Sequence, residues 1–282
     1  KTMANEAKVA AAAKVEKGNG LSTFFASFTI PLCLLVGILI FTFVMGAPSN
    51  FEGNDPANHP VQEGAGHVLG LIHKGGYIVP ILLSLVLMNI TFSIERYLTI
   101  GKAQGTGNAE AFVRKIRAKL DQNDVEGAIK ECDAQRGSVA NVMRSTLLKY
   151  KEMQGLTTMP VDQRIISIQK EIEESVTLEL PGLEKNLVVI ATMASVSTLI
   201  ALLGTVLGMI KAFSALATAG SPDSVALATG ISEALINTAL GIGNSAIATI
   251  MYNVFTSKID AITYAIDEAG YSIVQTFAAK NR

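Results

Sequence analysis

The sequence contains no tryptophan and few charges: only 17% of its 282 residues are Asp, Glu, Lys or Arg, whereas 49% are hydrophobic. This balance is typical of a membrane protein. The formal net charge is −1 at pH 7. Because no basic stripe with interleaved aromatic residues is present, nucleic acid is excluded as a partner.

Cysteine and histidine are scarce. Cys33 lies in an apolar stretch and Cys132 in a charged one. Since the two cannot meet across a membrane boundary, we expect no disulfide. All three histidines fall in one polar loop: His59, His67 and His73. We predict that they share no pocket with a nucleophile and do not converge as metal ligands.

The chain also lacks a Walker-type phosphate loop. The motif GIGNSA at residues 241–246 has the spacing of a dinucleotide fingerprint, but it lies inside an apolar helical stretch and not at a strand-to-helix turn. We therefore predict that the protein is not an enzyme and that it holds no metal and no cofactor.

Long apolar runs dominate the chain instead. Four stretches are long enough to cross about 30 Å of hydrocarbon, and no segment of useful length has the period of a β-strand. The sequence predicts an all-α integral membrane protein. Its last two helices are longer than a bilayer requires, so they either tilt or extend into the cytoplasm. The predicted transmembrane helices cover residues 23–47, 76–100, 187–213 and 225–257.

The distribution of Lys and Arg predicts which side each connection faces. The N-terminal tail (1–22) and the segment after the second span are rich in these residues, so both are predicted to be cytoplasmic. The loop 48–75 and the turn 214–224 carry few cations and are predicted to face the opposite side. Both chain termini, including the C-terminal helix 258–282, are then cytoplasmic.

Residues 101–186 form the predicted cytoplasmic helical domain. Apolar residues recur there at three- and four-residue steps, with breaks near residues 122–124 and 136–138. In each break Asp124 or Ser138 precedes the next apolar run, as a helix N-cap does. A further helix is predicted from Asp162 to Leu180. Pro181 and Gly182 interrupt it just before the third span, where they would kink it or mark the membrane interface.

Polar residues follow one side of the fourth span. Helical spacing places them within about half of the circumference: Glu233, Asn237, Thr238, Gly241, Asn244 and Ser245. The third span has a narrow face of small and hydroxyl side chains that includes Thr198 and Thr205, and its pair Gly204 and Gly208 predicts close helix packing. Packing alone explains the small residues. An ionised Glu233 is costly in lipid, so it must face a cavity, pair or stay protonated.

Two motifs in these spans carry a family resemblance. LLGTVLGMIKAF at residues 202–213, followed by ISEALINTALGI and IMYNVF, resembles the MotA/TolQ/ExbB proton channel family, and ExbB and TolQ most among its branches. The resemblance extends over residues 68 to 260. It implies a multi-pass protein of the bacterial inner membrane that conducts protons, with Na⁺ as an open alternative.

The resemblance also implies partners and site residues. It implies a homopentamer in the lipid bilayer whose last two spans line a channel, a dimer of a single-span ExbD-like protein inside it, and a TonB-like protein that receives the motion. By position, Thr205, Glu233 and Thr238 match the residues of the family's ion pathway. Further pore or packing positions are Thr198, Asn237, Gly241, Asn244 and Ser245, with Gly204 and Gly208 in helix packing.

Three departures from the family pattern keep alternatives open. The chain has an additional N-terminal span, Ile247 stands where a proline is usual, and Asn237 and Asn244 replace small apolar residues. The leading hypothesis is an ExbB-like stator that energises TonB-dependent transport. The alternatives are a TolQ-like envelope stator, a MotA-like motility stator and a passive oligomeric scaffold. A secondary transporter is disfavoured, because no internal repeat or broken span is evident.

Overall fold

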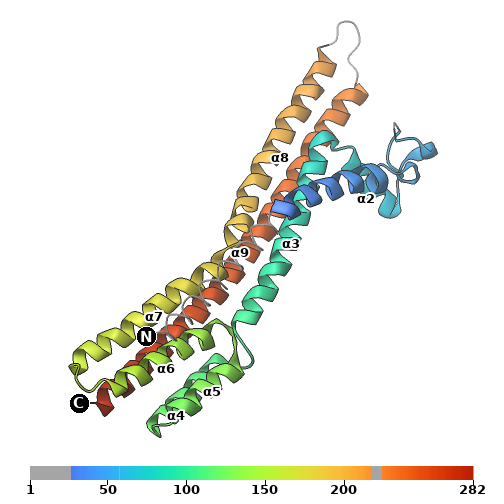
Figure 1. The fold of residues 1–282 in the computed structure, drawn as a ribbon. Helices are drawn as coiled ribbons and strands as arrows, with labels where there is room; N and C mark the ends of the chain where they lie inside the picture. Colours follow the sequence, from blue (N-terminus) through green and yellow to red (C-terminus); the bar gives the residue numbers. More distant parts are fainter. Residues whose placement is uncertain (1–26, 57, 218–223, 282) are drawn as a thin grey trace. The chain divides into compact units, whose positions relative to one another are not determined.

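A computed structural model describes residues 27–56, 58–217 and 224–281 (Figure 1). The predicted tail 1–22, the start of the first span and most of the predicted turn 214–224 lie outside these residues. Within the described part the secondary structure is helical, with one isolated bridge between Phe51 and Pro60. The predicted all-α fold is confirmed.

Four helical stretches of the described chain are long and apolar enough to cross a membrane. They are Ser27–Met45, Gly76–Ala103, Val161–Leu216 and Ser224–Lys280. The protein is therefore a multi-pass membrane protein, as the sequence predicts. Which side each connection faces stays a prediction from the charge distribution.

The chain divides into two compact units. The first unit comprises Lys1–Thr91 and Thr192–Thr249, and the second comprises Phe92–Ala191 and Ile250–Arg282. Helices α3 (Val79–Ala103), α8 (Leu187–Leu216) and α9 (Ser224–Lys280) contribute residues to both units.

In the first unit, the first span is helical over residues 27–39 and continues as the π-helix η1 (Ile40–Met45). The Asn50 side chain lies in the short 3-10 helix η2 (Pro48–Asn50) and donates to the carbonyls of Val44 and Met45 at 2.7 and 3.0 Å. These carbonyls end the π-helix and would otherwise lack partners. Asn50 thus fixes the point where the chain leaves the first span.

The predicted loop 48–75 contains the helix α2 (Gly64–His73), followed by the 3-10 helix η4 (Gly76–Ile78). The His73 ring stacks on Phe41 with 4.6 Å between centroids and meets Phe51 edge-on at 5.5 Å. Burial, and then the neighbouring Lys74 ammonium, lower the pKa of His73. His73 is therefore a packing residue. Among the described residues, no three His, Cys, Asp or Glu side chains gather as a metal site.

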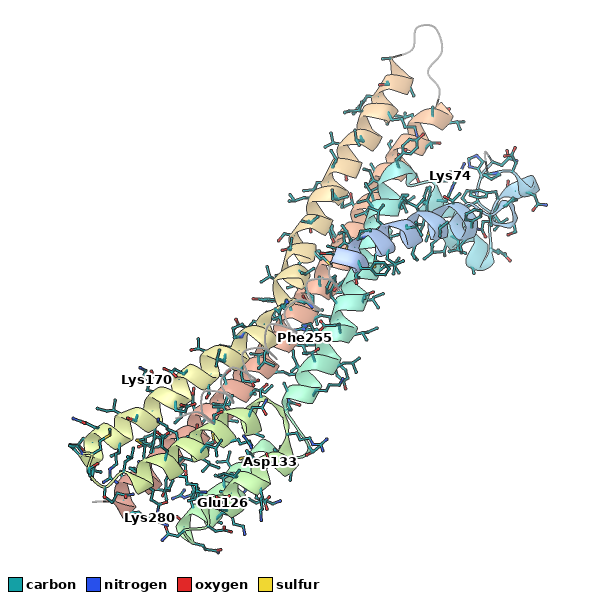
Figure 2. The ribbon with its side chains drawn as sticks, viewed as in Figure 1. Lys74, Glu126, Asp133, Lys170, Phe255 and Lys280 are labelled. Carbon is teal, nitrogen blue, oxygen red and sulfur yellow. The ribbon has the colours of Figure 1, made fainter. Side chains whose placement is uncertain are left out.

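The second unit contains α4 (Ala109–Asp121), α5 (Val125–Gln135), α6 (Gly137–Gly155) and α7 (Val161–Glu184), with the ends of α3 and α9. The predicted N-cap Asp124 is present: its carboxylate accepts from the Gly127 N–H at 2.8 Å, and this bond lowers the pKa of Asp124. Lys280, labelled in Figure 2, donates to the carbonyls of Leu120 and Asp121 at 2.5 and 3.0 Å. A cation thus caps the C-terminal end of α4.

The second predicted N-cap, Ser138, is wrong. Helix α6 begins at Gly137, and Arg136 before it has φ 56° and makes no side-chain cap. Gly137 itself has φ 84°. The chain turns between α5 and α6 on two left-handed residues, so the break is made by the backbone and not by a hydroxyl cap.

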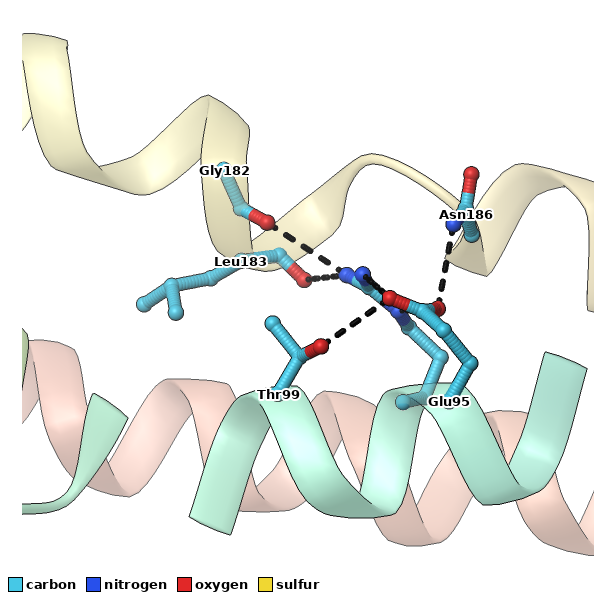
Figure 3. Close-up of polar contacts among 6 residues, drawn as sticks. Glu95, Thr99, Gly182, Leu183 and Asn186 are labelled. Atoms are coloured by element: carbon cyan, nitrogen blue, oxygen red, sulfur yellow. Dashed lines mark hydrogen bonds and ion pairs between the residues drawn. The ribbon is translucent and has the colours of Figure 1, made fainter. Parts of the chain in front are cut away.

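The predicted interruption at Pro181 is also wrong, because α7 runs through Pro181 to Glu184 and the turn before α8 falls at 185–186. Figure 3 shows hydrogen bonds to the carbonyls of Gly182 and Leu183. Their donor is Arg96, which is 2% exposed and lies 3.4 and 3.0 Å from these carbonyls. These bonds stabilise the last turn of α7 beyond the proline.

The charge of Arg96 is balanced locally. Its guanidinium donates twice to Glu95, at 2.7 and 2.5 Å, and Glu95 also accepts from Thr99 at 2.9 Å and from the Asn186 amide at 3.0 Å (Figure 3). A buried ion pair is tolerated when hydrogen bonds satisfy both ions. This cluster joins α3 to the α7–α8 junction within the second unit.

The core of the second unit is apolar and tightly packed. The rings of Tyr150 and Phe277 meet edge-on with 4.9 Å between centroids, and both side chains are buried. Cys132 lies in this core as a free thiol, and burial, followed by the Asp133 charge, raises its pKa to about 12. Cys33 is also a free thiol.

Candidate functional site

The first unit brings two threonine hydroxyls together. Thr205 of α8 and Thr238 of α9 lie with their Oγ1 atoms 2.5 Å apart, and both side chains are half-buried. Each hydroxyl also lies within hydrogen-bond distance of a carbonyl one turn earlier, that of Ala201 at 3.1 Å or Ala234 at 3.0 Å. Since a hydroxyl both donates and accepts, the pair can pass a hydrogen bond between the helices without fixed charge.

Glu233 lies one turn and a half before Thr238 on α9 and forms an ion pair. Its carboxylate accepts from the Lys211 ammonium of α8 at 2.8 Å. The Glu233 side chain is 11% exposed, whereas that of Lys211 is 60% exposed. The ammonium therefore stays in contact with the surroundings while the carboxylate is enclosed.

The turn at Gly75 and the start of η4, just before α3, provide the space for Glu233. Gly76 has φ 77°, and a Cβ atom there would collide with the Glu233 carboxylate. Gly75 beside it lies against Ile236, and its carbonyl accepts from the Asn237 amide at 2.9 Å. Two glycines thus let the backbone approach α9 closely, which a side chain would prevent.

The two asparagines of the fourth span face the interior of the unit. Asn237 is 0% exposed, and its Oδ1 atom has no hydrogen-bond partner among the described residues. Asn244 donates to Ser197 of α8 at 2.8 Å and accepts from Asn89 of α3 at 3.0 Å. Asn244 thus links three helices, which favours a packing role over contact with a pore.

Small residues bring α8 and α9 together. A Cβ atom at Gly204 would lie 2.8 Å from Asn237, and one at Gly208 would lie 2.8 Å from the Gly230 carbonyl. A Cβ atom at Gly241 would lie 2.7 Å from the Ser197 carbonyl and would collide with the Ala201 side chain. These contacts set the separation at which the two threonines meet. Such spacing is the usual effect of small residues on membrane helices.

The other predicted polar positions are less engaged. Thr198 is half-buried, and its hydroxyl donates to the Ala194 carbonyl at 3.4 Å in its own helix. Ser245 is half-buried, and its carbonyl accepts from Thr249 at 2.9 Å. The structure therefore places Thr205, Glu233 and Thr238 in one region and does not bring Thr198 or Ser245 into contact with them.

An apolar groove of about 580 Å³ runs along α8 beside Thr205. Its apolar side chains are largely exposed: Val206 is 55% exposed, Ile210 58% and Phe213 60%. The groove is lined by Thr205, Val206, Met209, Ile210, Phe213, Ser214 and Ala217. One of the two paired hydroxyls therefore borders a surface that accepts lipid or an apolar helix.

Sequence reasoning missed Lys211 as the partner of Glu233. The signal was present, since Lys211 is the only charged residue of α8 and Glu233 is the only one in the first 34 residues of α9, up to Lys258. Opposite charges that stand alone in two neighbouring apolar helices usually pair. Asn89, Ser197 and the Gly75–Gly76 pair carried no comparable signal.

Comparison with known proteins identifies the class. Residues 139–268 match the MotA/TolQ/ExbB proton channel family. A protein designated biopolymer transport protein ExbB-like 3 from Synechocystis is 30% identical over 186 residues, which cover 65% of this chain and 82% of that protein. The chain belongs to the MotA/TolQ/ExbB family. The family resemblance stated from the motifs is confirmed, and so is the prediction of a channel-type protein that is not an enzyme.

Two further relatives come from the TolQ and ExbB branches of this family. The Tol-Pal system protein TolQ of Pseudomonas aeruginosa is 28% identical over 124 residues, 44% of this chain and 54% of the relative. The biopolymer transport protein ExbB of Pseudomonas putida is 24% identical over 166 residues, 57% of this chain and 50% of the relative. The chain thus spans about half the length of these relatives.

Proposed function

We propose that the chain is the channel-forming stator subunit of a proton-driven complex in the bacterial inner membrane. The observation that carries the proposal is the hydrogen-bonded pair Thr205 and Thr238, which lies between two apolar helices, with Thr205 bordering the groove along α8. A hydroxyl pair can hold a water chain or orient a partner carboxylate in lipid without adding charge. In this proposal protons move past these hydroxyls, and Na⁺ is the alternative coupling ion.

The groove along α8 is the proposed seat of a partner helix. Its apolar lining suits a single transmembrane span, and Thr205 at its edge provides a hydrogen bond to an acidic residue of that span. The proposed complex is a homopentamer around a dimer of an ExbD-like protein, which moves a TonB-like protein and so energises transport across the outer membrane. The family relation supports this assignment.

A TolQ-like role in the cell envelope is the second candidate. The Tol-Pal system protein TolQ of Haemophilus influenzae is 42% identical over 84 residues, although this covers 30% of the present chain. The two candidates share the channel and differ in the protein that receives the motion.

Purification of the tagged full chain from its native membrane tests the proposal. In mild detergent, native mass measurement is expected to give five copies of the chain and two copies of a smaller single-span protein with an acid in its span. A monomer, or a pentamer that never carries a smaller protein, contradicts the stator assignment. The third protein that co-purifies distinguishes the ExbB-like role from the TolQ-like role.

The predicted sidedness has its own test. Asn54 and Gln104 are exposed; Asn54 precedes the second span along the chain and Gln104 follows it. In a variant without native cysteines, Asn54→Cys is expected to react with an impermeant maleimide added to intact spheroplasts, because the loop 48–75 carries few cations. Gln104→Cys is expected to react only after permeabilisation. Labelling of the Gln104→Cys variant in sealed spheroplasts would show that the predicted topology is wrong.

A further inference from the structure

The end of α3 in the second unit borders a second groove, of about 520 Å³. Tyr97 and Leu98 provide its apolar part and are 61% and 55% exposed. Lys102, Thr106 and Arg136 provide its polar part. The groove therefore combines an apolar wall with two cations.

The groove lies where apolar sequence gives way to charged sequence. Tyr97 and Lys102 stand in the last turns of the span Gly76–Ala103. In α9, Lys258 is the first charged residue after Glu233, and its ammonium lies 4.9 Å from the centroid of the Tyr97 ring. Tyr and Lys at the ends of spans are typical of the headgroup layer, where an apolar body and a polar tip are both solvated.

The cations of this groove are not neutralised within the described part of the chain. Lys102 and Arg136 of the groove, and Lys258 beside it, form no ion pair with any carboxylate there, and Glu95, on the same helix as Lys102, is occupied by Arg96. Some other cations of the second unit are paired, as Arg144 is with Asp133 and Lys170 with Glu174. The groove thus carries positive charge that an anion can match.

The backbone conformation of Arg136 is fixed by contacts with neighbouring segments. Its φ of 56° is unfavourable for a residue with a side chain. The backbone around it is held against the end of α3: a Cβ atom at Gly137 would lie 2.5 Å from the Ala103 carbonyl, and the Thr106 N–H donates to the Gln135 carbonyl at 2.7 Å. An arginine is therefore held at the groove by a strained turn that glycine would adopt more easily.

We propose that this groove binds one anionic phospholipid, with its phosphodiester on Arg136 and Lys102 and an acyl chain along Tyr97 and Leu98. Lys258 adds positive charge beside the Tyr97 ring. The apolar wall and the place at the end of a span favour a lipid over a free anion, since basic sites at this depth attract anionic headgroups.

The lack of tryptophan in the chain allows a direct test. Tyr97→Trp places a single fluorophore in the groove of the full-length protein, reconstituted in vesicles. Phosphatidylglycerol with brominated acyl chains is expected to quench this indole at lower mole fraction than brominated phosphatidylcholine. Lys102→Gln in the Tyr97→Trp background is expected to weaken the preference about fivefold, the effect of one cation near the surface. Arg136→Gln is expected to do the same, and Arg136→Lys is expected to retain most of the preference.

Two controls separate the groove from bulk lipid and from general charge. Ile90→Trp, at an exposed position of α3 within the apolar run, is expected to be quenched equally by both lipids. Lys170→Gln, which removes an exposed cation of α7, is expected to leave the lipid preference of the Tyr97→Trp protein unchanged. Equal quenching of the Tyr97→Trp indole by both lipids overturns the proposal. If neither lipid quenches the indole, protein covers the groove and the proposal is wrong. The proposal is also wrong if excess inorganic phosphate, at matched ionic strength, abolishes the lipid preference.

Discussion

Thr205→Val is expected to lower gradient-driven transport on the order of tenfold while pentamer yield stays at the parental level. Valine keeps the shape of threonine and removes the hydroxyl, so the hydrogen bond to Thr238 is lost. A factor of ten corresponds to about 1.4 kcal/mol, within the range of one hydrogen bond. Folding is expected to tolerate the change, because Thr238 still donates to the Ala234 carbonyl at 3.0 Å. The measurement is uptake of a TonB-dependent substrate beside native mass measurement of the complex.

Thr205→Ser is the matched control, since it keeps the hydroxyl and removes only the methyl group. It is expected to transport at a rate much closer to the parental one, as is Thr238→Ser beside Thr238→Val. If the valine and serine variants transport equally well, the hydroxyl pair serves helix packing and the proposed pathway is wrong.

Removing one partner of the Lys211–Glu233 pair is expected to have unequal effects. Lys211→Gln leaves an enclosed carboxylate without its cation. We therefore expect the free energy of unfolding in detergent to fall by roughly 1–3 kcal/mol. Glu233→Gln leaves Lys211, whose side chain is 60% exposed, so its stability loss is expected to be smaller. Transport is expected to fall on the order of tenfold in both variants. Thermal unfolding and substrate uptake are the measurements.

The double variant Lys211→Gln with Glu233→Gln separates charge from structure. It leaves no uncompensated ion, so its stability is expected to recover most of the loss seen for Lys211→Gln alone. Transport is expected to stay low if the Glu233 charge attracts cations to the pathway. Recovery of both stability and transport would show that the pair only holds α8 against α9.

Helix boundaries followed the sequence where a local signal set them. Asp124 caps α5 as predicted, because a carboxylate three residues before a free N–H needs no tertiary partner. The helix α7 does not end at Pro181, because Arg96 from another helix satisfies its last carbonyls. That contact joins residues 87 positions apart and has no signature near the proline.

The helix α2 was not expected in the loop 48–75. Its sequence GAGHVLGLIH contains three glycines, which weaken helix propensity and obscure its apolar spacing. In the structure Gly70 lies against Asn50, where a Cβ atom would approach the Asn50 carbonyl to 2.8 Å. Close packing in the first unit therefore overrides the local preference.

The sequence alone determined the membrane class, the four spans, the family and the polar positions, because hydrophobic length and helical periodicity are local properties of the chain. Helical periodicity placed these residues on the polar faces of the third and fourth spans, but it did not distinguish pathway residues from packing residues: Thr205, Glu233, Thr238, Asn237 and Asn244. Only the tertiary structure decided that the threonines bond to each other, that Lys211 holds Glu233, that Asn237 bonds to the Gly75 carbonyl and that Asn244 links helices. The reason is physical: these partners lie on different helices, and their distances depend on how closely the small residues of α8 and α9 let the backbones approach.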